Sequence, residues 1–329
     1  MKRVLIGLTG LVLVLLLAGV VFQFVATKID EYRYPALGEM VDVGGYSLHL
    51  YCTGEAGAPT VVMDIGAGGI GLDWQPVQPG VAEFARVCTY DRGGAGWSEP
   101  GAQPRTSQQF VEELHALLNN AGIEDPYVLV GHSLGGNNVQ LYASRYPDEV
   151  AGMVLVDPAF YNSPSYLDPE LQNAFAEAMM PSPGLSLWNK ILATIGVTRL
   201  PYTFGGETDE RTAISTHAKD AYEYIDEYSS LEESFKERRA ATVSLGDKPL
   251  MVLSAGARGG DMFPGFSQEQ SDQINEAWTK SEADLTQVSQ NSEQIIAEDS
   301  GHNIQADDPD LVIDAIRQVV EAARNGSSV

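Results

Sequence analysis

The residue pattern with the clearest chemical meaning is Gly-His-Ser-Leu-Gly-Gly at residues 131–136. It contains Gly-x-Ser-x-Gly, follows the apolar run 127–130 and precedes a segment, 137–146, that is typical of a helix. Strand, motif and helix in this order are the context of a nucleophile elbow, a sharp turn that exposes a reactive serine. The glycines allow the turn, and the first N–H groups of the helix stabilise developing negative charge. We therefore predict that Ser133 is a nucleophile.

A serine nucleophile needs a general base, and the chain contains five histidines. Only His302 lies in a loop between the last predicted strand and the last predicted helix, in Ser-Gly-His-Asn. Catalytic groups of parallel sheets gather at the carboxyl ends of the strands, so His302 is the predicted base. The other four lie in a hairpin, a helix, the elbow and a long insertion; they are His49, His115, His132 and His217.

Two aspartates could orient the predicted base. Asp157 ends the strand that follows the elbow helix, and Asp261 lies in a Gly-rich loop after the next strand. Either carboxylate could accept the second ring N–H of His302 and fix its tautomer, and both keep the chain order Ser, Asp, His. We favour Asp157, because a tight turn at a strand end holds a side chain better than a longer excursion does. Asp261 is the alternative.

The oxyanion of an acyl-transfer reaction needs two N–H donors. One is expected from the backbone of Leu134, at the start of the elbow helix. The other is expected from the glycine-rich loop after the predicted strand 60–65, at Ala67 or Gly68. Glycines in this loop let the backbone come close to a substrate carbonyl.

The same loop has a second interpretation, as a dinucleotide-binding site. Gly-x-Gly-x-x-Gly at residues 66–71 follows a strand, and Asp91 lies twenty residues beyond Gly71. The helix that should then hold the pyrophosphate contains Pro76 and Pro79, which remove backbone donors. We therefore expect no nucleotide. The chain also contains no His-Glu-x-x-His, no paired Cys-x-x-Cys and no phosphate-loop lysine, so we expect no metal and no cofactor.

Short apolar runs that alternate with helical periodicity surround these residues. Such alternation predicts a mostly parallel sheet covered by helices on both faces. The first two strands, joined at Gly44-Gly45, form a predicted hairpin. The predicted strands cover 39–43, 46–51, 60–65, 86–90, 127–130, 150–156, 249–254 and 294–297, and the predicted helices 73–85, 107–120, 137–146 and 309–323.

Residues 159–246 interrupt the alternation, because they contain no clear strand. We interpret them as a helical cap inserted into a core of residues 39–158 and 247–329, although they could instead form an independent domain. Apolar side chains in the cap suggest a pocket for an apolar substrate, or they could simply pack the cap itself. These side chains are Met179, Met180, Leu185, Leu187 and Trp188.

The N-terminus carries a membrane signal. The apolar run 4–26 would span about 34 Å as a helix, against a hydrocarbon core of ~30 Å. It is longer than the apolar part of most cleaved signal peptides, so residues 1–27 are a predicted signal anchor and 28–38 a tether. A cleaved signal and a secreted protein are the alternative. Lys2 and Arg3 favour a cytoplasmic N-terminus and an extracytoplasmic domain.

Composition limits the partners of the chain. Its 329 residues include 45 acidic and 20 basic ones, which give a net charge of −25. Binding to nucleic acid requires clustered Lys and Arg, so this charge argues against a nucleic-acid partner. We interpret the excess charge as a solvated acidic surface.

Taken together, the motifs resemble those of the α/β-hydrolase superfamily, in its esterase- and lipase-like branch. The resemblance covers residues 40–325 and rests on four motifs, at 131–136, 91–98, 156–158 and 300–302. It implies an eight-stranded, mostly parallel sheet in which only the second strand is antiparallel. It also implies a serine hydrolase mechanism through an acyl-enzyme. A serine at the elbow departs from the dehalogenase and epoxide-hydrolase branches, which use aspartate there.

The sequence also departs from the superfamily in two places. The oxyanion loop begins Asp-Ile-Gly-Ala-Gly rather than His-Gly, and the strand 249–254 has no close Gly-x-x-Asp after it. The superfamily's strand order makes the strands that carry Cys52 and Cys88 neighbours. A disulfide between these two cysteines is therefore implied, with two buried free thiols as the alternative.

The predicted function is a membrane-anchored serine hydrolase that cleaves small, apolar carboxylic esters. The elbow alone does not distinguish an esterase from a peptidase, an amidase or a lactonase, because all share this nucleophile. From another class, the chain could be a catalytically silent, membrane-anchored binding protein that retains the fold.

Overall fold

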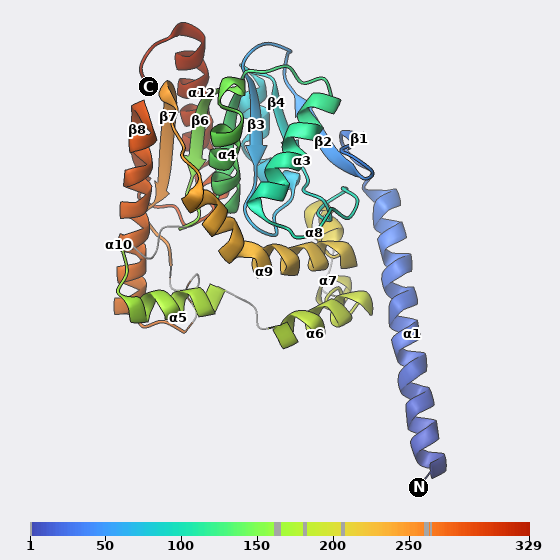
Figure 1. Cartoon of the computed structure of the whole chain (residues 1–329). Helices are drawn as coiled ribbons and strands as arrows, with labels where there is room; N and C mark the ends of the chain where they lie inside the picture. The colour runs from blue at the N-terminus through green and yellow to red at the C-terminus, as the bar shows by residue number, and fades with distance from the viewer. Residues whose placement is uncertain (1, 161–165, 180–182, 205–207, 260–262, 264) are drawn as a thin grey trace.

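The computed structural model of the chain describes residues 2–160, 166–179, 183–204, 208–259, 263 and 265–329. One sheet of eight strands forms its centre (Figure 1). The spatial order of the strands is β1-β2-β4-β3-β5-β6-β7-β8. The strands are β1 (Glu39–Asp42), β2 (Ser47–Thr53), β3 (Thr60–Asp64), β4 (Val87–Tyr90), β5 (Tyr127–His132), β6 (Val150–Val156), β7 (Gly246–Ala255) and β8 (Ser289–Ala297).

The pairing of the strands confirms the predicted fold. β2 runs antiparallel to both of its neighbours, β1 and β4, and every other neighbouring pair is parallel. The central strands are apolar along their whole length because both faces of the sheet are covered, and every residue of β5 is buried. The predicted disulfide is also present: Cys52 and Cys88 lie opposite each other in β2 and β4 and are bonded.

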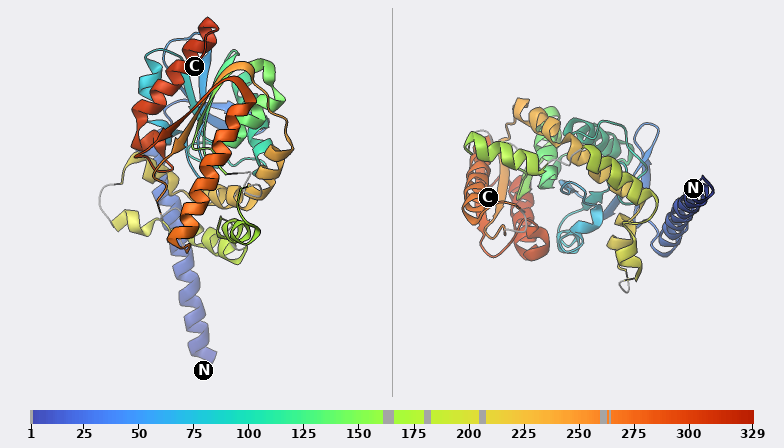
Figure 2. Two further views of the ribbon diagram at one scale, coloured as in Figure 1. Left: turned by 90° about the vertical axis from the view of Figure 1, so that its left-hand side faces the viewer. Right: turned by 90° about the horizontal axis from the view of Figure 1, so that it is seen from below.

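Helices cover the two faces of the sheet (Figures 1 and 2). On one face, α3 (Ser107–Asn120) and α4 (Leu134–Arg145) pack onto a core that includes Val62 and Leu129. On the other face, α2 (Gln78–Ala82) and α12 (Pro309–Asn325) pack onto Val61 and Val128. Successive residues of a strand point to opposite faces, so neighbours such as Val61 and Val62 belong to different core layers.

Two helical regions differ from the prediction. The helix expected over 73–85 is broken into a short 3-10 turn, η1 (Gly71–Trp74), and α2, with Pro76 at the break and Pro79 in the first turn of α2, where proline is tolerated. A long helix that was not predicted, α10 (Gln268–Leu285), lies between β7 and β8. The remaining short elements are η2 (Pro147–Glu149), η5 (Thr286–Val288) and α11 (Ile304–Asp307).

The insertion between β6 and β7 contains helices in all of its described parts. Its helices lie beyond one end of the sheet, and α9 is the one that packs on α3 and α4 (Figure 1). Ser234 on α9 accepts a hydrogen bond from the N–H of Ser107 (3.0 Å), and Arg238 donates to Gln140 on α4. The helices are α5 (Pro169–Met179), α6 (Pro183–Thr194), α7 (Leu200–Phe204), α8 (Glu210–Ser215) and α9 (Ala218–Ala240).

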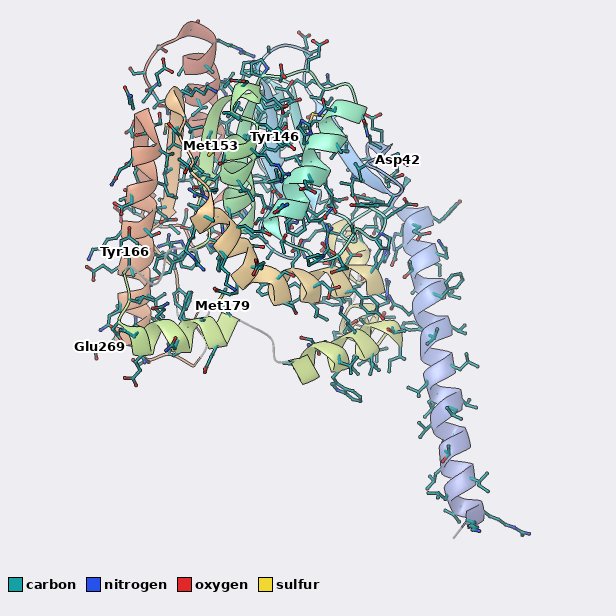
Figure 3. All side chains as sticks on the ribbon, viewed as in Figure 1. Asp42, Tyr146, Met153, Tyr166, Met179 and Glu269 are labelled. Carbon is teal, nitrogen blue, oxygen red and sulfur yellow. A yellow bond between two sulfur atoms is a disulfide. The ribbon has the colours of Figure 1, made fainter. Side chains whose placement is uncertain are left out.

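The N-terminal helix α1 (Lys2–Arg33) projects from the molecule past the insertion (Figures 1 and 3). It is long and apolar enough to cross a membrane, with a mean hydropathy of 2.9 over its most apolar window, and that window is not buried by the rest of the chain. The helix continues to Arg33, so the first part of the predicted tether is helical rather than extended.

Candidate active site

Ser133 lies at the turn between β5 and α4, in a strained backbone conformation with φ 51° and ψ −120°. Three backbone hydrogen bonds hold this conformation. The N–H of Ser133 donates to Val156 (3.2 Å), and its carbonyl accepts from Gly136 and Ala159 (both 2.9 Å). The turn therefore lies directly beside the end of β6, the strand that leads to Asp157.

The glycines of the elbow are required by close packing. A Cβ added at Gly131 would lie 2.5 Å from the carbonyl oxygen of Gly135, and one at Gly135 would lie 2.3 Å from that of Asp64. These contacts involve backbone atoms, so larger residues at either position would displace the turn. The motif spacing thus follows from the packing of β5, α4 and the end of β3.

His302 lies in the loop between β8 and α11, and its Nδ1 is 2.6 Å from Oδ2 of Asp157. Because an ionised carboxylate only accepts hydrogen bonds, Nδ1 carries the proton and Nε2 remains available as a base. The rings of Trp278 and His302 are arranged edge to face, with a centroid separation of 5.6 Å. The structure therefore brings His302 to Asp157, the acid that the sequence favoured, while Asp261 lies outside the described residues.

His132 supports His302 from the elbow itself. Its Nε2 donates to the carbonyl oxygen of His302 (2.9 Å), and the two rings are 4.7 Å apart. Burial lowers the pKa of His132 to about 3, so its ring is neutral at physiological pH. Sequence reasoning assigned no role to this residue, because nothing in the motif shows that the two loops meet.

Asp157 is fully buried and is held by several donors. Its Oδ1 accepts from the N–H of Ala255 (2.8 Å), and Arg258 contacts both of its oxygens, with Nε 3.0 Å from Oδ2. Burial alone would raise the pKa of Asp157. The hydrogen bond from His302 and the charge of Arg258 outweigh burial and hold that pKa below its ordinary range. Asp157 is therefore ionised wherever the protein is folded at neutral pH.

Arg258 and Glu282 form a second layer that the sequence did not reveal. Arg258 lies in the loop after β7, and its Nη2 donates to Glu282 on α10 (2.7 Å) while its guanidinium stacks over Trp278. Burial, followed by the charge of Asp157, raises the pKa of Glu282 well above its ordinary value. A buried arginine that contacts both Asp157 and Glu282 holds the carboxylate of Asp157 in place.

The loop after β3, which was predicted to supply an oxyanion donor, is fastened by Arg92. This buried side chain donates to the carbonyl oxygens of Ile65 (2.8 Å) and Gly66 (2.6 Å), and to Asp64. It also binds Glu227 on α9, whose Oε2 accepts the N–H of Gly68 (2.6 Å). The N–H of Gly68 is thus already engaged.

The other candidate in this loop, Ala67, has different surroundings. It packs with Leu134 and with Phe110 and Leu231, from α3 and α9. The two proposed oxyanion donors, Ala67 and Leu134, therefore lie in one small apolar cluster beside the elbow.

The contacts of Asp91 argue against the dinucleotide interpretation of the same loop, because partners within the chain already occupy its carboxylate. Its carboxylate accepts the N–H groups of Gly71 (2.7 Å) and Trp97 (3.0 Å) and contacts Nδ1 of His49 (2.9 Å). The spacing between the glycines and Asp91 reflects this internal contact. No group of three or more His, Cys, Asp or Glu side chains within the described part of the chain is placed to bind a metal ion.

Aromatic side chains flank the site on two sides. On the side of His302, Phe160, Phe175, Phe263 and Trp278 belong to one cluster between α5 and α10. On the side of the oxyanion loop, Tyr224 on α9 lies so close to Gly68 that a Cβ there would come within 2.3 Å of its ring. Of the cap side chains that were predicted to line a pocket, Met179 packs against the aromatic cluster beside His302, whereas Leu185, Leu187 and Trp188 are exposed. Met180 is outside the described residues.

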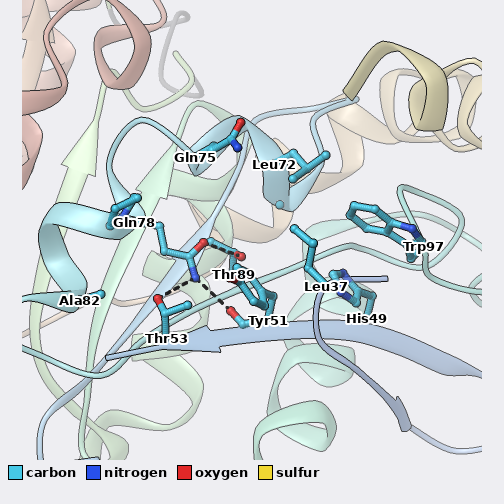
Figure 4. Close-up of a pocket in the computed structure, with 12 residues that line it drawn as sticks. Leu37, His49, Tyr51, Thr53, Leu72, Gln75, Gln78, Ala82, Thr89 and Trp97 are labelled. Atoms are coloured by element: carbon cyan, nitrogen blue, oxygen red, sulfur yellow. Dashed lines mark hydrogen bonds between the residues drawn. The ribbon is translucent and has the colours of Figure 1, made fainter. Parts of the chain in front are cut away.

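A cavity of about 420 Å³ lies apart from these residues, between η1, α2 and β2 (Figure 4). It is lined by Leu37, Leu72, Gln78 and Trp97, among others, and by none of the three predicted catalytic residues. Gln78 donates to the carbonyl oxygen of Tyr51 and to Thr53, so it ties the cavity wall to β2. His49 at the cavity has both ring nitrogens engaged, by Asp91 and by the N–H of Gly38, so it is not placed to act as a base.

The chain is similar to known proteins in both sequence and structure. A family model described as alpha/beta hydrolase fold matches residues 59–309. YqjL, an uncharacterized protein of Bacillus subtilis, is 28% identical over 283 residues, covering 85% of this chain and 91% of YqjL. Lipase LipV of Mycobacterium tuberculosis is 35% identical over 136 residues, which is 37% of this chain and 51% of LipV. The solved structure of the epoxide hydrolase CorEH superposes with a TM-score of 0.61 at 20% identity, covering 84% of this chain and 95% of CorEH.

Proposed function

Since the chain belongs to the α/β-hydrolase family, we propose that it is a serine hydrolase that cleaves carboxylic esters through an acyl-enzyme. One observation carries the proposal: the N–H of Ser133, strained at a strand-to-helix turn, is bonded to the residue before Asp157, and this buried, ionised aspartate is 2.6 Å from Nδ1 of His302. This arrangement fits nucleophilic catalysis by Ser133, His302 and Asp157.

In the proposed mechanism, Oγ of Ser133 attacks the ester carbonyl while Nε2 of His302 removes its proton. Asp157 keeps the other ring proton on Nδ1 and stabilises the imidazolium that forms. The tetrahedral oxyanion accepts the N–H of Leu134, at the positive end of α4, and the N–H of Ala67. His302 then protonates the leaving alcohol, and a water molecule hydrolyses the acyl-enzyme by the same steps in reverse.

Ala67 is the better candidate of the two for the second oxyanion donor. The N–H of Gly68 is held by Glu227 at 2.6 Å, so it could reach a substrate only if this contact broke. The clamp of Arg92 and Glu227 would keep the loop in place while the charge develops, as preorganised donors must be.

The aromatic walls support an apolar acyl or alcohol group in the substrate. Phe160 and Trp278 flank the side of His302, and Tyr224 flanks the side of Gly68. The partial relationship to a lipase is consistent with an ester substrate. A peptidase, an amidase or a lactonase would use the same three residues, and a silent binding protein would keep the fold without the reaction.

We further propose that α1 anchors the protein in a membrane, with the catalytic domain outside the cytoplasm. Lys2 and Arg3 precede the apolar run, which favours a cytoplasmic N-terminus. The disulfide between Cys52 and Cys88 fits an oxidising compartment. The alternative is secretion after cleavage of α1.

The decisive experiment is labelling with a fluorophosphonate probe. We expect the wild type to be labelled and Ser133→Ala to be unlabelled. Ser144→Ala, on the same helix α4, is the matched control and should be labelled like the wild type, because its hydroxyl only donates to the carbonyl of Thr242. Labelling of Ser133→Ala would show a different nucleophile, and an unlabelled wild type would favour the silent binding protein. A panel of p-nitrophenyl esters, lactones and aminoacyl amides would then define the substrate class.

A further inference from the structure

The cap exposes a set of large apolar side chains that the proposed reaction does not use. They lie on α6, on α7 and in the turn between them. Leu187 is 63% exposed and Trp188 is 57% exposed, and these are high values for such side chains in a chain with a polar surface. The apolar cap face, as we define it, consists of Leu185, Leu187, Trp188, Ile191, Val197, Leu200 and Tyr202.

The charge of this segment differs from the charge of the rest of the chain. The protein has 45 acidic residues among 329, yet none lies between Glu177 and Glu207. The two basic side chains of the segment are paired with carboxylates, Lys190 with Asp226 on α9 and Arg199 with Asp30 on α1. The segment therefore has the composition of a surface that meets an apolar phase rather than water.

The turn between α6 and α7 is packed against α1. Gly19 of α1 lies so close to Ile195 that an added Cβ would be 2.6 Å from its carbonyl oxygen, and Gly196 is similarly close to Phe22. Gln23, which is only 4% exposed, is the one buried residue of α1. Its side chain donates to the carbonyl oxygen of Thr216 (3.0 Å) and accepts from Arg199 (3.2 Å).

These contacts fix the height of the cap relative to the anchor. Residues 19–23 belong to the apolar run 4–26, and Gly19 lies about 10 Å nearer the N-terminus than Ala26 along the helix axis, at ~1.5 Å per residue. If the apolar run lies in a bilayer, the turn that touches Gly19 and Phe22 must lie in the outer part of the acyl region, below its boundary with the headgroups. α6 packs on α9, and α9 packs on α3 and α4, so α6 is the outer layer of the cap, on the side on which α1 extends (Figure 1).

We propose that the apolar cap face contacts the lipid of the membrane that holds α1. The region of lipid that this face contacts lies at the boundary between headgroups and acyl chains of the outer leaflet and in the outer part of the acyl region. Trp188 and Tyr202 have the side chains that concentrate at this depth, and the leucines would enter the acyl region. The proposal rests on α1 being a membrane anchor, which is part of the proposed function.

The test uses the full chain reconstituted in phosphatidylcholine vesicles. Some vesicles carry bromine on the upper acyl chain, which quenches tryptophan fluorescence on contact. We expect brominated lipid to quench the wild type and Trp188→Phe to lose most of this quenching. Trp97→Phe is the matched control and should keep it, because Trp97 is tied to the carbonyl oxygen of Tyr34 in the catalytic domain.

Flotation of the same samples through alkaline carbonate separates the two hypotheses. A chain that floats with the vesicles but shows no quenching that depends on Trp188 has an anchor and no lipid contact at the cap, and that result overturns the present proposal alone. A chain that does not float has no anchor, and both hypotheses are then wrong. Dimers in detergent, together with no lipid quenching, would assign the apolar cap face to a second copy of the chain.

Discussion

Asp157 positions His302 while it is itself held by Ala255 and Arg258. Changing it to Asn would remove the negative charge and present an N–H to Nδ1, which favours the wrong tautomer of the histidine. We therefore expect Asp157→Asn to lower kcat about 10⁴-fold, as loss of the orienting acid does in related mechanisms.

Asp261→Asn is the matched control for this prediction, and its kcat should stay near that of the wild type. Hydrolysis of a p-nitrophenyl ester measures both variants. A large loss in Asp261→Asn with a nearly active Asp157→Asn would reverse the assignment of the acid.

His132 makes the stability of the fold depend on pH. Burial lowers its pKa in the folded state from 6.5 to about 3, so between these values the unfolded chain binds a proton that the folded chain does not. Stability is therefore lost as the pH falls through this window, by about 1.4 kcal/mol per pH unit from this group.

Between pH 6.5 and 5 the titration of His132 lowers the free energy of unfolding of the wild type by roughly 2 kcal/mol. We expect His132→Gln to lack this loss, so its stability should fall less over the same interval. The free energy of unfolding in urea, measured at both pH values, gives the difference. His115→Gln, on the surface of α3, controls for the loss of a histidine from a partly exposed position. Parallel curves for His132→Gln and the wild type would refute the prediction.

At the residue scale, the sequence could predict those site residues that lie in short local motifs. Ser133 and His302 lie in short motifs with a required order of strand, turn and helix, and their positions were predictable. Arg258 and Glu282 were not, because a buried ion pair joins separate elements and leaves no spacing signature. The contact between Gly68 and Glu227 likewise joins residues 159 positions apart.

At the scale of elements, α9 and the oxyanion loop form one unit through Glu227. Removing this carboxylate would leave the buried guanidinium of Arg92 with Asp64 as its one ionic partner among the described residues and would release the N–H of Gly68. We expect Glu227→Ala to lower the free energy of unfolding by about 3–5 kcal/mol, the usual cost of breaking a buried pair. Esterase activity should fall as well, because the loop loses its clamp.

Glu233→Ala is the matched control on the same helix. Its carboxylate pairs with Lys236 on the exposed surface, and such pairs contribute only about 0–1 kcal/mol. Urea unfolding of the two variants and the wild type tests the comparison. Equal stability losses in both variants would show that the pair of Arg92 and Glu227 does not stabilise the fold.

The elements themselves were predicted unevenly. α3 was predicted at its observed bounds, because its apolar stripe and the glycine beyond its end are both clear in the sequence. α10 was missed, because it buries small and polar side chains such as Ser271, Ala277 and Ser281 beside Trp278. β8 begins earlier than expected, at Ser289, where pairing with β7 determines strand formation in a polar sequence.

At the scale of the whole molecule, the proposed anchoring of α1 in a membrane makes its orientation determine which compartment the proposed site faces. We expect a membrane-impermeant maleimide to label Ser327→Cys in intact cells, because Ser327 is exposed at the end of the catalytic domain. Lys2→Cys should be labelled only after the cells are opened. The reverse pattern would place the domain in the cytoplasm.

The contacts of α9 divide the insertion into two parts, because α9 packs on the core near Ser133 and the described part of the segment before it does not share these contacts. By position in the chain α9 belongs to the insertion, yet its side chains complete the loop beside Ser133 and bind Arg105 at the edge of α3. Exchanging the whole insertion between relatives would therefore cut through the proposed catalytic site. The segment that could be exchanged carries α5 to α8 and ends before α9. Exchanging it would change substrate preference and membrane contact and would leave the proposed catalytic site unchanged.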